Sequence, residues 1–139
     1  MTTRDTDTGG VLESMILPAL QRGQYTVRTQ VVIGQRIGRG KHKIDAIATK
    51  GERSVLVSLK WQQVGGTAEQ KVPFEVICLA EALRTGSPFA AAYLVLGGEG
   101  WSLRQFYVGG GLDQYLKDAD RVRVLTLESF IARANTGQL

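Results

Sequence analysis

The stretch KHKIDAIATKGERSVLVSLKWQ, residues 41–62, decides the fold. Two apolar, β-branched runs flank a short polar turn, which predicts two neighbouring strands. The first run carries one carboxylate, Asp45, and the second carries Ser58 and Lys60. Residues two apart on a strand share a face, so Ser58 and Lys60 are expected to point the same way. A lysine held there is costly unless carboxylates, a metal ion or a phosphate lie beside it.

The rest of the chain predicts an α/β fold, a mixed central sheet flanked by helices. A buried strand is expected in the apolar run FAAAYLVLG, and Thr126 is expected to cap the last helix. Residues 101–116, interrupted by three glycines, give no clear pattern. The expected helices cover 11–22, 67–83 and 127–137, and the expected strands cover 24–33, 44–49, 54–62, 89–97 and 121–125.

Length and composition predict one domain. The 139 residues, 43% of them hydrophobic, suffice for one core and are too few for two. The polar start predicts a disordered tail over residues 1–8, followed by the domain over residues 9–139. This start resembles no secretory signal, and no apolar run approaches the roughly 18 residues that would span a bilayer. The single cysteine, Cys78, excludes an internal disulfide, so we expect a soluble, cytoplasmic protein.

The charge balance favours a polyanionic partner. Seventeen Lys and Arg against 13 Asp and Glu give a net charge of +4. The turn GQRIGRGKHK interleaves basic residues with glycines, which suits close approach to phosphates, although a solvated turn is the alternative. The expected nucleic-acid-binding residues are Arg36, Arg39, Lys41 and Lys43. The lone histidine, His42, is more typical of a structural or surface group.

Glu13 is a further candidate. It follows the i, i+3, i+4, i+7 spacing with Ile16, Leu17 and Leu20, which predicts that its carboxylate leans toward the sheet. The alternative is an exposed residue of the first turn that stabilises the helix dipole.

Taken together, these residues resemble the PD-(D/E)XK nuclease superfamily, in which a helix carries a glutamate, one strand an aspartate and the next strand (D/E)-x-K. Within it, the chain is similar to archaeal-type Holliday junction resolvases and compact restriction enzymes. The resemblance implies a restriction endonuclease-like fold and hydrolysis of DNA phosphodiester bonds, either structure-selective or of restriction or homing type. It also implies a Mg²⁺ cofactor, for which Mn²⁺ can substitute. Because cutting two strands needs two sites, we expect a homodimer or larger assembly.

Two positions depart from the family pattern. Ile44 stands where the pattern has proline, and Ser58 stands at the acidic position of (D/E)-x-K. Some restriction enzymes with S-x-K supply the missing carboxylate from the following helix. Glu69 is our first candidate for it if the helix starts at the capping-box pair formed by Thr67 and Gln70, and Glu75 is the alternative if it starts at Pro73.

The resemblance then implies a catalytic site. Lys60 would stabilise negative charge or orient the attacking water, and Gln62 would fix a water. The expected metal ligands are Asp45, Glu69 and Glu13, and the expected catalytic residues are Glu13, Asp45, Ser58, Lys60, Gln62 and Glu69. The alternative function is a catalytically inactive nucleic-acid-binding protein that keeps the nuclease fold, and Ser58 is the main argument for it.

Overall fold

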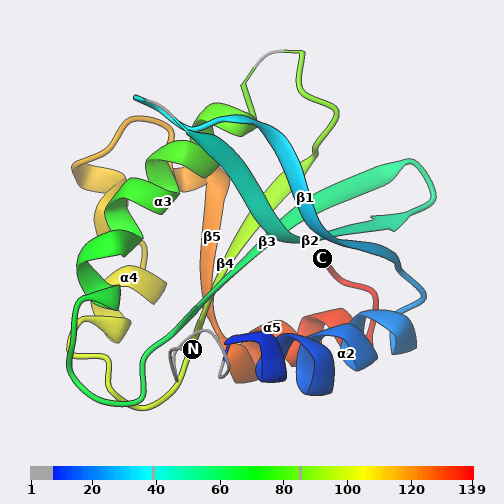
Figure 1. Ribbon diagram of the computed structural model, residues 1–139, viewed down its shortest axis with the longest axis horizontal. Helices are drawn as coiled ribbons and strands as arrows, with labels where there is room; N and C mark the ends of the chain where they lie inside the picture. Colours follow the sequence, from blue (N-terminus) through cyan, green and yellow to red (C-terminus); the bar gives the residue numbers. More distant parts are fainter. Residues whose placement is uncertain (1–7, 39, 85) are drawn as a thin grey trace.

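A five-stranded sheet with the order β1-β2-β3-β4-β5 forms the centre of the computed structural model, which describes residues 8–38, 40–84 and 86–139 (Figure 1). The first three strands pair antiparallel as a meander, and β3, β4 and β5 run parallel. The mixed sheet predicted from the sequence is therefore confirmed. The strands are β1 (Thr26–Gln35), β2 (Lys41–Lys50), β3 (Arg53–Trp61), β4 (Ala91–Gly97) and β5 (Val122–Thr126).

Helices cover both faces of the sheet (Figure 1). On one face lie the π-helix η1 (Leu12–Ile16), α2 (Leu17–Arg22) and α5 (Leu127–Asn135), whereas α3 (Ala68–Ala82) and α4 (Arg104–Val108) lie on the other. The segment that had no clear pattern, residues 101–116, contains α4 and the short 3₁₀ helix η2 (Gly111–Gln114), and a second short 3₁₀ helix, η3 (Ala119–Arg121), precedes β5. Among the described residues, no helix is long and apolar enough to cross a bilayer.

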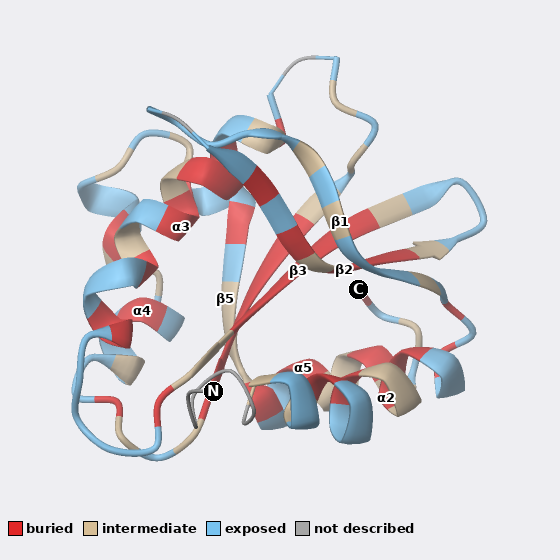
Figure 2. Ribbon diagram, viewed as in Figure 1, coloured by how far each residue is buried: buried red, intermediate tan, exposed pale blue. Residues whose placement is uncertain are grey.

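The sheet separates two apolar clusters, because side chains alternate along each strand. Leu56 packs on the α3 side, whereas its neighbours Val55 and Val57 pack on the α2 and α5 side. Buried residues accordingly run along the strands and the inward faces of the helices (Figure 2). β4 is buried on both faces, as its continuous apolar sequence predicted.

The β1–β2 hairpin differs from the prediction. β2 begins at Lys41, so Lys41 and Lys43 lie on a strand rather than in the basic turn. The turn is closed by a hydrogen bond from the Arg36 amide to the Gly40 carbonyl. Arg39 and most of the expected tail over residues 1–8 lie outside the described residues, and Thr8 is already helical.

The start of α3 agrees with the first of the two predicted alternatives. The helix begins at Ala68 with Thr67 as its N-cap residue, but the Thr67 side chain makes no capping hydrogen bond, so the predicted capping box does not form. Pro73 lies inside the helix, where it cannot donate a hydrogen bond to the Glu69 carbonyl. The Tyr107 hydroxyl donates to that carbonyl instead, at 2.8 Å. A side chain from α4 therefore satisfies the acceptor that Pro73 leaves open.

Candidate active site

β2 and β3 separate at the candidate site. Their ladder of paired residues runs from Lys50 and Arg53 to Ala46 and Val57, and ends there. A cavity of about 500 Å³ lies beyond the last pair. The polar side chains that line it include Gln30, Lys43, Asp45, Ser58, Lys60 and Glu75. Asp45, Ser58 and Lys60 therefore meet at one cavity, as the sequence predicted.

Asp45 is held by the backbone of β3. Its Oδ2 accepts a hydrogen bond from the Leu59 amide at 2.7 Å. Burial raises the pKa of Asp45, and repulsion from Glu75 adds to this rise, whereas the Leu59 amide and the Lys60 ammonium oppose it. The half-buried Asp45 carboxylate therefore lies close enough to Glu75 for the two charges to repel each other, and a cation between them would stabilise both.

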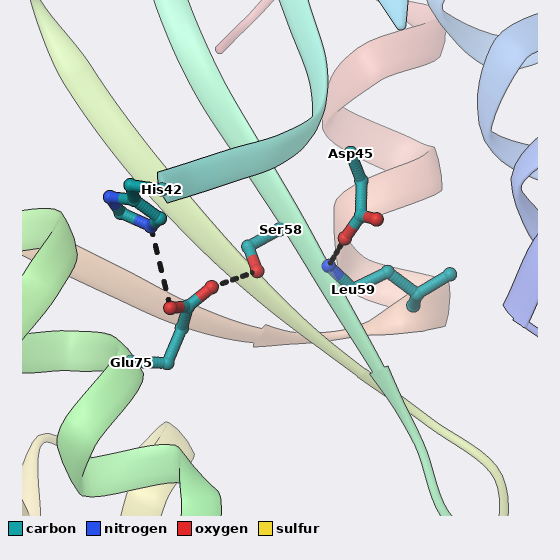
Figure 3. Close-up of polar contacts among 5 residues, drawn as sticks. All are labelled: His42, Asp45, Ser58, Leu59 and Glu75. Atoms are coloured by element: carbon teal, nitrogen blue, oxygen red, sulfur yellow. Dashed lines mark hydrogen bonds and ion pairs between the residues drawn. The ribbon is translucent and has the colours of Figure 1, made fainter. Parts of the chain in front are cut away.

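Ser58, the residue before Leu59, binds a second carboxylate, that of Glu75. Ser58 Oγ donates to Glu75 Oε2 at 2.6 Å, and both side chains are buried (Figure 3). Burial alone would raise the pKa of Glu75, but the contacts with His42 and Ser58 and the charge of Lys60 lower it to about 2. Glu75 therefore stays ionised in the cavity at neutral pH.

His42 approaches the other oxygen of the same carboxylate. Its Nε2 lies 3.5 Å from Glu75 Oε1, which is too long for a good hydrogen bond, and this buried nitrogen has no hydrogen-bond partner among the described residues. His42 was not among the residues predicted for the site. A signal was available, because His42 and the buried Ile44 are two apart on β2 and so share its inward face.

Lysine side chains supply the positive charge of the cavity. Lys60 is half-buried at the end of β3, and Lys43 and Lys71 line the same space. Two carboxylates and several lysines thus face one cavity. This combination suits the binding of a phosphate together with a cation, since each group balances the charge of the other.

Glu69, our first candidate for the relocated acid, lies elsewhere. Its carboxylate accepts hydrogen bonds from the Ser102 and Leu103 amides, and these bonds, with the Ser102 amide contributing most, lower its pKa despite burial. It does not line the cavity. Glu75 follows Glu69 by six positions, so their side chains lie about 120° apart around the helix and point to different sides. The expectation that Glu69 lies at the metal site is therefore wrong, because its carboxylate points to the loop at Ser102 and Leu103 and not into the cavity.

Gln62 belongs to the same structural network. Its Nε2 donates to Glu69 Oε1 at 3.0 Å and to the Gly100 carbonyl at 2.8 Å. The buried amide therefore joins α3 to the loop after β4, and it does not line the cavity. The prediction that Gln62 fixes a water at the catalytic site is therefore wrong, because its side-chain amide is bound to Glu69 and Gly100 outside the cavity.

Glu13 is exposed and lies outside the cavity lining, whereas its neighbour Leu12 is buried and contributes to that lining. The predicted inward orientation of Glu13 is therefore wrong. The buried residues Leu12, Ile16, Ala19 and Leu20 follow the i, i+4, i+7, i+8 spacing of one helical face, and Glu13 lies at the edge of that face.

The expected nucleic-acid-binding residues are divided between two places. Lys43 lines the cavity, and the exposed Lys41 precedes it on the same face of β2. Arg36 instead extends over α3, with its guanidinium 5.2 Å from the centre of the Phe74 ring. Lys41 and Lys43 therefore form a short row of positive charges on β2 that ends at the cavity.

The carboxylates present fit a hard divalent cation that binds together with a phosphate. No three His, Cys, Asp or Glu side chains gather as a metal cluster within residues 8–38, 40–84 and 86–139. Asp45 and Glu75 nevertheless repel each other across one cavity. Mg²⁺ is commonly bound by one or two carboxylates, with waters and substrate phosphate completing its shell. Two carboxylates are therefore a sufficient protein contribution.

Comparisons with known proteins agree with this architecture. A family model described as a PD-(D/E)XK nuclease superfamily domain matches residues 4–138. Among solved structures, the crystal structure of AF1548, a protein of unknown function, is similar with a TM-score of 0.50 and 10% sequence identity. The match covers 81% of this chain and 54% of that one, so this chain spans about half of its length, and the likeness concerns the fold alone. No curated protein matches.

Proposed function

This chain belongs to the PD-(D/E)XK nuclease superfamily, and we propose that it is a metal-dependent endonuclease that hydrolyses DNA phosphodiester bonds in the cavity between β2 and β3. The observation that carries the proposal is the hydrogen bond of 2.6 Å between Ser58 and Glu75. It brings a carboxylate to the strand position where the family pattern has one and this sequence has a hydroxyl.

Asp45 and Glu75 would hold the metal ion, which we propose is Mg²⁺, with Mn²⁺ able to substitute. When bound, such an ion supplies Lewis-acid stabilisation of the phosphoryl oxygens and lowers the pKa of water. Leu59 and Ser58 orient the two carboxylates from consecutive positions of β3, through hydrogen bonds of 2.7 Å and 2.6 Å. The strand therefore sets the direction of both ligands at once.

Lys60 would act on the phosphate itself. Its half-buried ammonium lies in the same cavity as both carboxylates. A fixed positive charge there stabilises the negative charge that develops on the phosphate, and a low-dielectric surrounding strengthens this effect. Removing it should therefore lower the catalytic rate more than the stability of the fold.

Lys41 and Lys43 support DNA as the substrate class, because they line the approach to the cavity along β2. Contacts to backbone phosphates fix the position of a duplex without reading its sequence. We therefore propose structure-selective cutting, as in junction resolvases, ahead of restriction-type or homing-type cutting. We further propose that the active form is a homodimer or larger assembly, since two strands require two sites.

A cleavage screen tests the proposal. Labelled four-way junctions, flaps, duplexes and single strands are incubated with the protein in Mg²⁺, Mn²⁺ or EDTA, beside folded Lys60→Ala. We expect cleavage of at least one DNA only with a divalent ion, and a loss of about 100-fold or more in Lys60→Ala.

Two outcomes would contradict the proposal. DNA binding without any cleavage would favour the inactive nucleic-acid-binding alternative, and equal cleavage by Lys60→Ala would remove the assigned role of that lysine. Light scattering at working concentration, with and without DNA, tests assembly, and a monomer in both conditions would contradict the dimer.

A further inference from the structure

Gln30 has a strained backbone in the middle of a strand. Its φ is +55°, in the left-handed region that non-glycine residues rarely occupy. The other non-glycine residues with positive φ among the described residues, Gln24 and Asp118, lie outside the strands. A glycine would adopt this conformation at little steric cost, so a glutamine here stores conformational strain. Such strain concentrates at functional sites, where something other than local stability maintains it.

The strain coincides with a change of face in two strands. In β1, Val27 packs with the α2 and α5 cluster, whereas Val31 packs with the α3 cluster. Residues four apart on a regular strand would share a face. The same change occurs in β2 between Ala46 and Ile44.

The change of face falls at Gln30 and Asp45. The paired residues Thr29 with Ala46, and Val31 with Ile44, flank these two positions, so Gln30 stands opposite Asp45 across the strands. The irregular backbone therefore sits at the candidate metal ligand.

Gln30 also contributes to the wall of the cavity. It is exposed and lines the cavity together with Lys43, Asp45 and Lys60. Packing does not explain an exposed side chain of this length. Chemically, a glutamine offers a neutral amide that can donate to an anionic oxygen without competing as a cation for Asp45. A polyanionic ligand entering beside Lys43 would meet that donor.

We propose that Gln30 is a substrate-binding residue, whose side-chain amide donates a hydrogen bond to an oxygen of the phosphate that neighbours the scissile phosphate. This inference rests on the proposed nuclease function. The face change at Gln30 presents the amide on the same wall as Asp45, and the strained backbone is the cost of that placement.

The test compares two glutamines that both have a positive φ. Gln24 has φ +70°, is exposed and does not line the cavity, so Gln24→Gly is the matched control for Gln30→Gly. Both variants should melt at or above the wild-type temperature, because glycine relieves the positive φ. Only Gln30→Gly should lose DNA affinity, by about fivefold to tenfold in fluorescence anisotropy with EDTA, and a similar factor in kcat/KM with Mg²⁺.

A third variant, Gln30→Glu, tests whether the amide donor matters or only the length of the side chain. Gln30→Glu keeps the length but replaces the donor with a negative charge, so it should bind DNA more weakly than Gln30→Gly. The inference is overturned if Gln30→Gly binds and cleaves like the wild type, or if Gln24→Gly loses as much. If the wild type binds DNA but never cuts it, the DNA affinities of the variants alone test whether Gln30 binds the substrate. If the wild type neither binds nor cuts, the proposed function fails and this inference fails with it.

Discussion

Ser58 Oγ and Glu75 Oε2 are joined by a hydrogen bond of 2.6 Å, although the two residues lie 17 positions apart in the chain. Neither residue exposes more than 5% of its surface. The Ser58 hydroxyl thus donates to a carboxylate from α3. In the site that we propose, Ser58 stands where the superfamily pattern has an acid, and Glu75 would supply the carboxylate that β3 lacks.

Removing the Ser58 hydroxyl should weaken both the fold and the site. In Ser58→Ala the buried Glu75 carboxylate loses a donor, which should lower the free energy of unfolding by about 1–3 kcal/mol and kcat by roughly tenfold. Urea unfolding and single-turnover cleavage measure the two effects. Ser54→Ala is the control, because Ser54 lies on the same strand but bonds the Thr49 hydroxyl. Equal losses in cleavage for both variants would deny Ser58 an orienting role.

Asp45→Asn should abolish metal-dependent cleavage while leaving the protein as stable as the wild type, or more stable, at pH 7. The amide oxygen can still accept from the Leu59 amide, but the desolvated charge is gone. Burial raises the pKa of Asp45 above 3.8, so the folded state binds this proton at a higher pH than the unfolded state does. The free energy of unfolding of the wild type should therefore rise as pH falls through the raised pKa toward 3.8. Thermal melts against pH should show this gain in the wild type. Its persistence in Asp45→Asn would assign it to another group.

Glu75 should produce the opposite dependence. Its pKa of about 2 lies below the ordinary 4.5, so its ionised form stabilises the fold above pH 4.5, and that contribution is lost as pH falls toward 2. The full difference corresponds to at most about 3 kcal/mol. Denaturant titrations between pH 5 and 2 should show a shallower loss for Glu75→Gln than for the wild type. Parallel curves would mean that Glu75 is not held as an anion.

Lys43 should contribute to the salt dependence of DNA binding. Each phosphate contact that is lost reduces the slope of log affinity against log salt by about 0.9. Lys43→Ala should flatten the slope by about that amount, and Lys41→Ala should behave similarly. Lys50, at the other end of β2 and near the Tyr25 ring, provides the control. An equal change of slope in Lys50→Ala would move the DNA-binding surface away from the cavity.

The strand that carries Ser58 and Lys60, and the position of Asp45 on its neighbour, could be predicted because they depend on local alternation. The order of helices and strands followed from the same periodicity. The choice between Glu69 and Glu75 could not be predicted from where α3 begins. The helix begins at Ala68, the start that favoured Glu69, yet the Glu75 carboxylate is the one that reaches Ser58. Pro73 lies inside this helix because the Tyr107 hydroxyl, from another helix, compensates its missing hydrogen bond.

The orientations of Glu13 and His42 were also not predicted. Glu13 lies at the edge of the helical face formed by Leu12, Ile16, Ala19 and Leu20, where periodicity alone does not decide whether a side chain is buried. For His42, the start of β2 at Lys41 gives the histidine its inward face. The sequence before Ile44 is basic and rich in glycine, which predicts a turn, so the start of the strand that turns His42 inward was missed.

Whether Glu75 replaces the carboxylate missing from β3 can be decided by comparing Glu75→Gln with Glu69→Gln. Both variants are measured in one single-turnover assay below their melting temperatures. We expect Glu75→Gln to lose about 100-fold or more in cleavage rate, and to lose Mg²⁺ binding measured by calorimetry with DNA present. We expect Glu69→Gln to cleave within a few-fold of the wild type but to melt at a lower temperature, because Glu69 holds Gln62 and the loop at Ser102 and Leu103 rather than the metal. The reverse order of the two losses, or wild-type cleavage by Glu75→Gln, would contradict the claim.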